Sequence, residues 1–413
     1  MTSREAQALA AANAAAAEAG TGATDTIIAG CDMVRFGVFF DGTWNSRDFS
    51  AQPGYSWHTN VELLEAFYDT PVDPITETIN GQPRQVRYMK EYYRGPGITE
   101  NGRTYTNLGG ATGRGSEGVV ARVNKASEDI PHMIHEQNQD AVPCDLWFDV
   151  FGFSRGAAAA RTFANRVKSG QISYSGARTN TKFLGVFDTV VSTRGVSDTR
   201  GFNRDKSIDI RTAGNVAEQV VHITAKDEIR RNFPLSQTVA GKRIAIAGAH
   251  SDIGGGYNPG VERGELTFMA SQGWQLLEYF RNNWHIGQDG NEISQETIRN
   301  AVDAALNHNP QRVTLSVEAQ HGLQFVALRL MHFEAKSRNL PFPDELPDTI
   351  NGQEMSEELQ AYLEALIAED SETIAELEKD IRSRYAHWSA RSNLTDRIAH
   401  EPEWDARRRV YSV

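Results

Sequence analysis

A serine at position 154 lies between two glycines, Gly152 and Gly156, in the pattern Gly-x-Ser-x-Gly. The apolar run before it, residues 146–151, predicts a buried strand, and the alanines at 157–160 predict a helix. Strand, tight turn and helix together form a nucleophile elbow, in which the glycines keep side chains from colliding. At a helix N-terminus, free N–H groups favour developing negative charge. We therefore predict that Ser154 is a nucleophile rather than part of an ordinary turn.

A serine nucleophile needs a histidine base and an acid that orients it, and here the acid follows the serine in the chain. Asp188 lies 34 residues after Ser154, and Asp252 lies 98 residues after it. Each follows an apolar run that predicts a strand. We prefer Asp252, because the acid usually comes from the later strand end, and Asp188 is the alternative acid. Otherwise Asp188 caps the next turn or helix and braces the site.

The predicted base is His387. It follows a long helical segment, lies in an aromatic setting between Tyr385 and Trp388, and comes where a loop after the final strand should deliver the base. His250 is only two residues from Asp252, so both cannot easily point to Ser154 from one strand end. Packing within the loop is the preferred reading for His250, and a base role is the alternative. The other histidines after the acid lie in helical, linker or apolar sequence: His285, His308, His321 and His332.

An oxyanion hole needs two backbone N–H donors beside the nucleophile. One would come from Arg155, the residue after the serine. The other should come from a loop after an earlier strand, and Asp41-Gly42-Thr43 follows the apolar run 34–40. Gly42 allows close approach of the backbone, and the N–H of Thr43 is the natural second donor. The alternative for Asp41-Gly42 is a plain turn.

Apolar runs alternate with helical segments along the first 261 residues, which predicts an α/β fold with a mostly parallel sheet flanked by helices. Function in such sheets gathers at the carboxyl ends of the strands. Asp41, Ser154, Asp188 and Asp252 all follow such runs, which predicts one shared site. The four clearest predicted strands cover residues 34–40, 146–151, 181–187 and 243–249.

The chain divides by sequence character into four parts. Residues 1–30 predict a flexible leader, and 31–261 the α/β core. Residues 262–382 predict a helical insertion over the sheet that acts as a lid, and 383–413 a return to the core that carries His387. Within the insertion, residues 356–382 predict one amphipathic helix with its acidic residues on the solvent face.

Composition excludes several classes of protein. The formal net charge is −12, and residues 354–380 hold ten acidic residues against one lysine, so no basic footprint for nucleic acid exists. No apolar run reaches the ~20 residues of a membrane span. The N-terminus does not read as a Sec signal, which predicts a cytoplasmic protein or export by another route.

The sequence predicts no cofactor and no metal. The glycine runs at 109–118 and 254–256 lack the Gly-Lys-Ser/Thr ending of a phosphate loop. A metal site built from Asp41, His250 and Asp252 is a weak alternative. Cys31 and Cys144 each lie at the edge of an apolar run, and we predict buried free thiols rather than a disulfide or a metal site.

Six motifs in order, together with a late histidine, resemble the α/β-hydrolase-like lipase effectors of bacterial type VI secretion. They run from about residue 34 to 262. The motifs are Phe40-Asp41-Gly42-Thr43-Trp44-Asn45, Tyr93-Arg94-Gly95-Pro96-Gly97, Gly152-Phe153-Ser154-Arg155-Gly156-Ala157, Gly185-Val186-Phe187-Asp188-Thr189-Val190, Asp227-Glu228-x-Arg230 and Gly248-Ala249-His250-Ser251-Asp252-Ile253-Gly254-Gly255-Gly256-Tyr257, with the histidine in Tyr385-Ala386-His387-Trp388-Ser389.

This resemblance implies an α/β-hydrolase-like fold and a phospholipase or carboxylesterase that cleaves phospholipid acyl esters at a membrane surface through a Ser-Asp-His triad. It also implies delivery by a secretion machine into a rival cell's periplasm, and a cognate immunity protein in the producer. Three alternatives remain: a catalytically silent hydrolase fold that serves as a binding module of the secretion machine, an esterase for a soluble ester, and the weaker metal-dependent hydrolase.

Overall fold

The computed structural model describes most of the chain outside its first 31 residues, and the predicted leader at 1–30 lies outside the described part. The described residues are 32–50, 57–99, 115–137, 143–174, 176–192, 207–284, 303, 307, 312–390 and 402–413.

A seven-stranded sheet forms the centre of the molecule, in the order β2-β3-β1-β4-β5-β6-β8. All neighbouring pairs are parallel except β2 with β3. The predicted mostly parallel sheet is therefore confirmed, and the four predicted strands fall on β1, β4, β5 and β8. The strand bounds are β1 Met33–Phe40, β2 Ile75–Ile79, β3 Gln82–Tyr93, β4 Asp145–Phe153, β5 Arg178–Phe187, β6 Gln219–Ala225 and β8 Lys242–Ile246.

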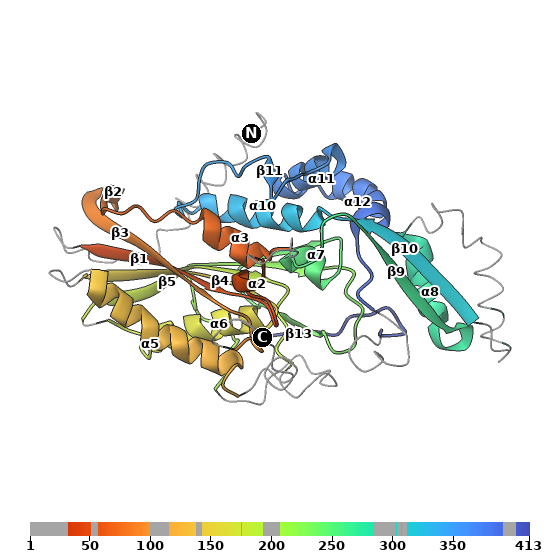
Figure 1. The fold of residues 1–413 in the computed structure, drawn as a ribbon, viewed down its shortest axis with the longest axis horizontal. Coiled ribbons are helices and arrows are strands. Elements are labelled where there is room, and N and C mark those ends of the chain that lie inside the picture. The colour runs from red at the N-terminus through yellow and green to blue at the C-terminus, as the bar shows by residue number, and fades with distance from the viewer. Residues whose placement is uncertain are drawn as a thin grey trace.

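Helices cover both faces of this sheet (Figure 1). One face carries α5 (Val119–Gln137) and α6 (Arg155–Lys168), and the other carries α3 (Asn60–Phe67) and α10 (Leu323–Lys336). Every residue of β1 is buried. Met33 and Phe39 enter one hydrophobic cluster, the even-numbered residues 34–40 enter the other, and buried Arg35 bonds Asp149. A strand covered on both faces therefore reads as a mainly apolar run.

The region 262–382, expected to be a helical insertion, also contains strands. β9 (Val261–Met269) pairs antiparallel with β10 (Arg312–Gln320), and α8 (Ala270–Asn283) follows β9. α10 packs directly on the central sheet, where the sulfur of Met331 would lie 2.8 Å from a Cβ on Gly185 in β5. Part of the region is thus a layer of the core, and a lid role stays a prediction.

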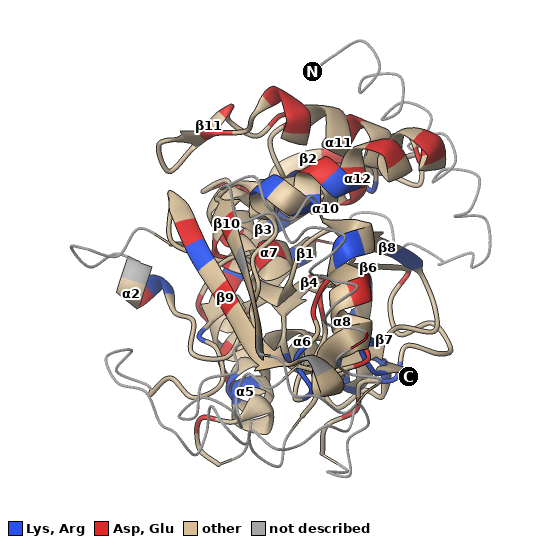
Figure 2. Cartoon of the chain, turned by 90° about the vertical axis from the view of Figure 1, so that its right-hand side faces the viewer, with Lys and Arg blue, Asp and Glu red and all other residues tan. Residues whose placement is uncertain are grey.

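The single helix predicted over 356–382 is wrong, because the chain forms two helices there. α11 (Glu357–Ile367) ends before Glu369, which has a positive φ of 54°. α12 (Ser371–Tyr385) then begins after Asp370, whose carboxylate accepts the N–H of Thr373. This cap restarts the helix in a new direction. Acidic residues recur along both helices (Figure 2), and most of them are at least partly exposed, whereas Glu378 of α12 is buried and pairs with Arg382.

The remaining elements are short. α2 spans Arg47–Ser50, α7 spans His250–Gly254, and β11 (Thr349–Ile350) pairs with β12 (Gln353–Glu354). β7 (Leu235–Gln237) pairs parallel with β13 (Val410–Ser412), which brings the segment 402–413 beside the loops that follow β6. Among the described helices, none is long and apolar enough to cross a membrane.

Cys144 is disulfide-bonded, so the prediction of free thiols is wrong. The chain has one other cysteine, Cys31, which lies outside the described residues. The two cysteines come just before β1 and β4, which are parallel neighbours that begin at the same edge of the sheet, with Met33 opposite Asp145. The N–H of Cys144 also donates to the carbonyl of Asp32. Local sequence patterns could not reveal this strand neighbourhood.

Candidate active site

Ser154 lies in the tight turn between β4 and α6, and its backbone has φ 57° and ψ −123°. A positive φ at a serine is strained. A Cβ on Gly152 would lie 2.5 Å from the carbonyl oxygen of Gly156, and a Cβ on Gly156 would lie 2.1 Å from the carbonyl oxygen of Asp41. Both flanking positions therefore require glycine, and the predicted strand, turn and helix are confirmed.

The backbone of Ser154 is bonded to the segment that carries Asp188. Its N–H donates to the carbonyl of Phe187 at 3.0 Å, and its carbonyl accepts the N–H of Val190 at 3.3 Å. The hydroxyl does not cap α6, although Ser154 occupies the N-cap position. The side chain is thus held at the helix N-terminus without being used for helix capping.

The loop after β1, which was predicted to supply an oxyanion donor, packs against this turn. Gly42 touches the ring of Phe153 so closely that an added Cβ would lie 2.5 Å from it. The side chain of Arg155 donates to the Thr43 hydroxyl at 3.0 Å and to the Ser192 carbonyl at 2.7 Å. The structure therefore brings Gly42, Thr43 and Arg155 to the nucleophile turn, while the donor roles of the two backbone N–H groups stay a prediction.

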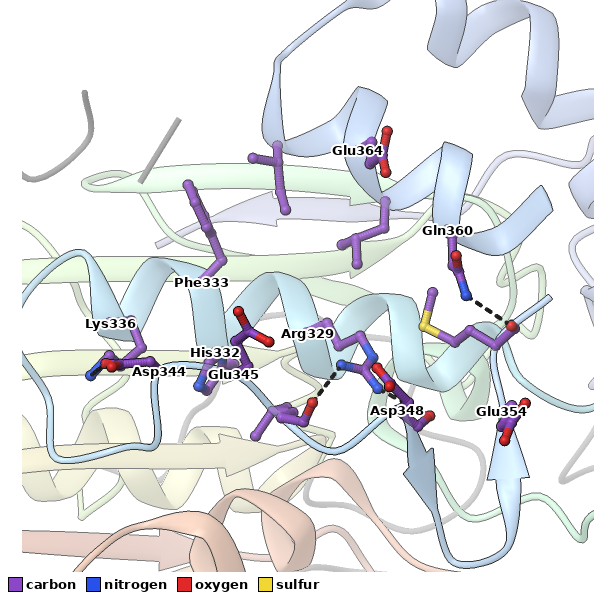
Figure 3. A pocket seen from close by; sticks show the side chains of 14 residues that line it. Arg329, His332, Phe333, Lys336, Asp344, Glu345, Asp348, Glu354, Gln360 and Glu364 are labelled. Carbon is purple, nitrogen blue, oxygen red and sulfur yellow. Dashed lines mark hydrogen bonds and ion pairs between the residues drawn. The ribbon is translucent and has the colours of Figure 1, made fainter. Parts of the chain in front are cut away.

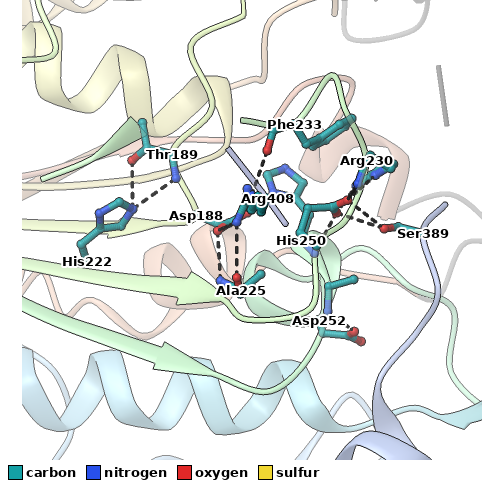
Figure 4. A network of polar contacts seen from close by, with 12 residues as sticks. Asp188, Thr189, His222, Ala225, Arg230, Phe233, His250, Asp252, Ser389 and Arg408 are labelled. Carbon is teal, nitrogen blue, oxygen red and sulfur yellow. Dashed lines mark hydrogen bonds and ion pairs between the residues drawn. The ribbon is translucent and has the colours of Figure 1, made fainter. Parts of the chain in front are cut away.

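Asp188 and His250 form one aspartate–histidine pair (Figure 4). Asp188 follows β5, the strand next to β4, and its carboxylate accepts Nδ1–H of His250 at 2.6 Å. His250 begins α7, after β8. Its ring lies 4.6 Å from the ring of Phe153, the residue before the serine, and 4.9 Å from that of Phe233. The pair is buried beside the nucleophile turn.

The charge state of this pair is set by burial and by an arginine. Burial lowers the pKa of His250 below its ordinary value and outweighs Asp188, which raises it. For Asp188, burial alone would raise the pKa, but the guanidinium of Arg408 and the hydrogen bond from His250 lower it below the usual range. The geometry therefore favours a neutral imidazole beside a fixed carboxylate.

Asp252 and His387, the preferred acid and base, form a second pair. The Asp252 carboxylate accepts Nδ1–H of His387 at 2.6 Å, the His387 backbone N–H at 3.0 Å and the Ala249 N–H at 2.8 Å. The His387 ring stacks on Tyr257, with 3.8 Å between the ring centroids. Burial lowers the pKa of His387, but Asp252 and then Glu262 raise it above its ordinary value.

The structure brings His387 to Asp252 but does not join it to the serine. Within the described residues, the buried Nε2 of His387 has no hydrogen-bond partner. As expected from the sequence, His250 and Asp252 face different partners, because His250 bonds Asp188 and Asp252 bonds His387. Of the other histidines, His332 is a core residue whose Nε2 bonds the Pro343 carbonyl, while His285 and His308 lie outside the described residues.

Charged residues to which the sequence analysis gave no role surround the Asp188–His250 pair. Arg408 binds the Asp188 carboxylate with both terminal nitrogens, at 2.6 and 2.7 Å. Glu228 accepts hydrogen bonds from Arg230 at 2.7 and 2.9 Å and from the Ser389 hydroxyl at 3.0 Å. The motif Asp227-Glu228-x-Arg230 gave a signal for the second cluster, but nothing in the sequence linked Arg408 to Asp188.

A pocket of about 520 Å³ opens elsewhere, between α10 and α11 (Figure 3). Its lining mixes Arg329 and Lys336 with carboxylates such as Asp348, and it includes none of the candidate catalytic residues. Across the described part of the chain, no three His, Cys, Asp or Glu side chains group as they would around a metal ion. Asp41, His250 and Asp252 thus form no such group.

Comparison with known proteins adds a family match over part of the chain. Residues 165–272 match the model of the type VI secretion phospholipase effector Tle1-like catalytic domain. That stretch includes Asp188, His250 and Asp252, while Ser154 and His387 lie outside it. A comparison with curated proteins finds no match.

Two solved structures are similar over most of the chain. The Tle1 effector bound to the VgrG spike of the type 6 secretion system is 21% identical, with a TM-score of 0.63, and the match covers 94% of this chain and 95% of that one. An uncharacterized protein from Pseudomonas aeruginosa is 17% identical, with a TM-score of 0.46, over 91% of this chain and 56% of that one. The fold shared with the Tle1 effector and the match at 165–272 confirm the resemblance to the Tle1-like phospholipase effectors of type VI secretion.

Proposed function

We propose that the chain is a phospholipase effector of type VI secretion, a serine hydrolase that cleaves phospholipid acyl esters. The observation that carries this proposal is the strained Ser154 at a strand-to-helix turn, bonded through its backbone to the segment whose Asp188 holds His250. The match at residues 165–272 supports the substrate class. If either the serine geometry or the family match were absent, only a hydrolase fold could be inferred.

Within this proposal, Ser154, His250 and Asp188 form the triad. Their order along the chain is serine, acid, histidine, as this kind of site requires. The three come from the ends of β4, β5 and β8, which lie on one side of the sheet order, and His250 packs on the neighbour of the serine. The pair Asp252–His387 satisfies the same order and remains the second candidate; His250 is preferred because its ring contacts Phe153, the residue before the serine.

The chemistry follows from these positions. Nε2 of neutral His250 takes the proton of the Ser154 hydroxyl as its oxygen attacks the ester carbonyl, and the imidazolium that forms is stabilised by Asp188. The backbone N–H groups of Thr43 and Arg155 hold the oxyanion. His250 then gives the proton to the leaving alcohol, and water, activated by the same imidazole, releases the fatty acid from the acyl-enzyme.

In this scheme Asp252 and His387 brace the loop between β8 and β9. Asp252 bonds the N–H of Ala249, directly before His250, and His387 ties that carboxylate to the segment after α12. A bracing pair keeps the position of His250 without exchanging protons with substrate. Loss of His387 should therefore loosen the site, whereas loss of His250 should remove the base.

Hydrolysis assays with phospholipid vesicles and short-chain esters test the proposal. Ser154→Ala and His250→Ala should each lower kcat by several orders of magnitude, because triad members act as a unit. His387→Ala should cost no more than about 100-fold, the effect of displacing a catalytic group by 1 Å. Equal activity of wild type and Ser154→Ala would discard the mechanism, and a larger loss in His387→Ala than in His250→Ala would restore the Asp252–His387 assignment.

The proposal extends to location and partners. By analogy with the VgrG-bound Tle1 effector, we infer that a secretion-spike component carries this chain. From the resemblance to the type VI lipase effectors, we further infer delivery to the periplasm of a target cell and an immunity protein that protects the producer. Labelling of Ser154 by a fluorophosphonate, together with the hydrolysis assays, separates a phospholipase from a silent binding module and from an esterase for a soluble ester. A protein that never labels supports the silent binding module, and one that hydrolyses short esters but no vesicles supports a soluble substrate.

A further inference from the structure

Arg408 contacts the proposed triad acid together with the histidine, and both side chains bond the same carboxylate oxygen of Asp188. Its two terminal nitrogens donate to the two oxygens of Asp188, and its Nε donates to the Phe233 carbonyl at 2.9 Å. The Ala225 N–H donates to the same carboxylate at 3.0 Å. The Arg408 side chain is only 7% exposed. Asp188 therefore has one partner that would take part in catalysis, His250, and a charged partner that fixes it.

Arg408 is itself held in place by the segment 402–413, which we call the strap. β13 of the strap pairs with β7, and the Leu235 N–H donates to the Arg409 carbonyl at 2.9 Å. At the other end of the strap, the Glu403 N–H donates to the Ile229 carbonyl at 2.7 Å. The strap thus spans the loop that carries Glu228 and Arg230, and it places Arg408 against the carboxylate of Asp188.

A bidentate arginine fixes both the position and the charge of a carboxylate. Two parallel N–H···O bonds leave the carboxylate one orientation, and its remaining lone pairs face His250 and the backbone. The positive charge of Arg408 also offsets part of the negative charge of Asp188, so the carboxylate stabilises a protonated imidazole less strongly. Without Arg408, the whole carboxylate charge would stabilise a protonated His250, and the buried carboxylate would be free to rotate.

We propose that Arg408, supplied by the strap, is a positioning residue of the hydrolase reaction that orients Asp188 and through it the base His250. This inference rests on the proposed triad. It assigns a role in the reaction to a segment that lies outside the family match at residues 165–272.

The charged and titratable groups around Asp188 and His250 determine how the loss of Arg408 should appear in a pH profile. His250 is faced by Asp188 on one side and by the Glu228–Arg230 pair on the other, and its backbone N–H donates to Glu228 at 3.3 Å. Asp188 is faced by His250 and Arg408, with neutral His222 nearby, whose pKa burial lowers to about 3. Removal of Arg408 takes away the guanidinium that pairs with Asp188 and leaves Arg230 in place beside Glu228.

The test compares Arg408→Gln with Arg409→Gln in the full chain, assayed for ester hydrolysis over a range of pH. Arg409 is the matched control, because it lies next in the strap and pairs with Glu403 rather than with Asp188. Arg408→Gln should lower kcat by about 10–100-fold, as supporting residues do, with little change in KM. Its acid limb should move to higher pH, whereas Arg409→Gln should match wild type.

Two further variants separate orientation from folding. Arg408→Lys keeps the charge but not the bidentate geometry, so it should restore the acid limb and only part of kcat. In an Asp188→Asn background, Arg408→Gln should cost no further activity, because the two residues act through one carboxylate. Thermal unfolding of each variant verifies that the comparison is made between folded proteins.

The possible results also separate this inference from the proposed function. If Asp188→Asn is inactive while Arg408→Gln keeps the wild-type kcat and acid limb, the triad stands and the positioning role is overturned. If Asp188→Asn is fully active, the proposed triad fails first. Should Arg408→Gln not fold, the decision passes to Arg408→Lys, whose wild-type kcat would overturn the requirement for a bidentate contact.

Discussion

Two aspartate–histidine pairs lie near Ser154, and they differ in the charges around them. Arg230 adds to burial in lowering the pKa of His250, whereas Glu262 adds to Asp252 in raising the pKa of His387. An imidazole with a lowered pKa is neutral over more of the pH range and is ready to accept a proton. An imidazole with a raised pKa is charged over more of the pH range and suits a bracing ion pair. Local charge therefore favours different roles for two similar pairs.

The pH dependence of kcat/KM discriminates between these two histidines. The base must be neutral in the free enzyme, so activity falls as the pH drops through its pKa. The ordinary value for a histidine is 6.5, and the pKa of His250 lies below it while that of His387 lies above it. We expect the acid limb below pH 6.5. A limb above pH 6.5 that disappears in His387→Asn would assign the base to His387 instead.

At the scale of elements, the site depends on how closely α6 approaches the loop after β1. Gly156, in the first turn of α6, faces the Asp41 carbonyl, and Gly42 faces Phe153. Asp41 is anchored in turn, because its carboxylate accepts the Gly42 N–H at 2.6 Å and the Tyr92 hydroxyl. These contacts fix the distance between the serine turn and the loop that supplies the proposed oxyanion donor.

Gly156→Ala should therefore damage activity more than stability. The added methyl would lie 2.1 Å from the Asp41 carbonyl oxygen, so the loop must move. Overpacking of this kind costs about 1–3 kcal/mol of unfolding free energy, and a 1 Å displacement of a catalytic group costs about 100-fold in rate. Thermal unfolding and the rate of fluorophosphonate labelling at Ser154 measure the two effects. Unchanged labelling by a folded Gly156→Ala would show that this spacing is not critical.

The sequence predicted those parts of the site that local patterns determine. The elbow at Ser154 and the strand ends at Asp188 and Asp252 follow from apolar runs that stop at polar residues. The sequence favoured Asp252 over Asp188 from strand order alone, and it could not settle this choice, because the choice depends on which strands are neighbours and where each carboxylate points. The contact of Arg408 with Asp188 could not be predicted, since the two residues lie 220 positions apart along the chain.

Two errors in the fold have similar physical causes. Apolar periodicity over 356–382 suggested a single helix, but a positive φ at Glu369 and the Asp370 cap divide it. Periodicity reports which face is buried and not whether the axis is straight. The free thiol predicted for Cys144 was wrong, because the neighbourhood of β1 and β4 is a property of the sheet order.

At the scale of the whole molecule, residues 356–390 and 402–413 bind the loops of the central sheet at several points. Arg382 of α12 donates to both carboxylate oxygens of Asp227 at 3.0 Å, and the Tyr362 hydroxyl accepts the Ala247 N–H at 3.0 Å. Ser389 bonds Glu228, as described above. Because these contacts reach the loop after β6 and the residues just before His250, the C-terminal part of the chain acts as a framework for the site.

The disulfide at Cys144 makes stability depend on redox conditions. A native disulfide contributes about 2–5 kcal/mol to the unfolding free energy, so a reductant should lower the Tm of wild type by several degrees. Cys144→Ser is the control, and its Tm should not respond to the reductant. Differential scanning fluorimetry with and without dithiothreitol measures both. A wild-type Tm that ignores the reductant would mean that the bond contributes nothing to stability.

The distance along the chain between Asp188 and Arg408 also sets an order of events during synthesis. At about 5–20 residues per second, a ribosome needs on the order of tens of seconds to pass from Asp188 to Arg408, 220 residues later. Throughout that interval the nascent chain already contains the serine turn, but the carboxylate of Asp188 has no arginine to hold it, and His250 and His387 are themselves added only later in the interval. The anchored acid is thus completed late in translation, and a chain interrupted before residue 408 can never form it.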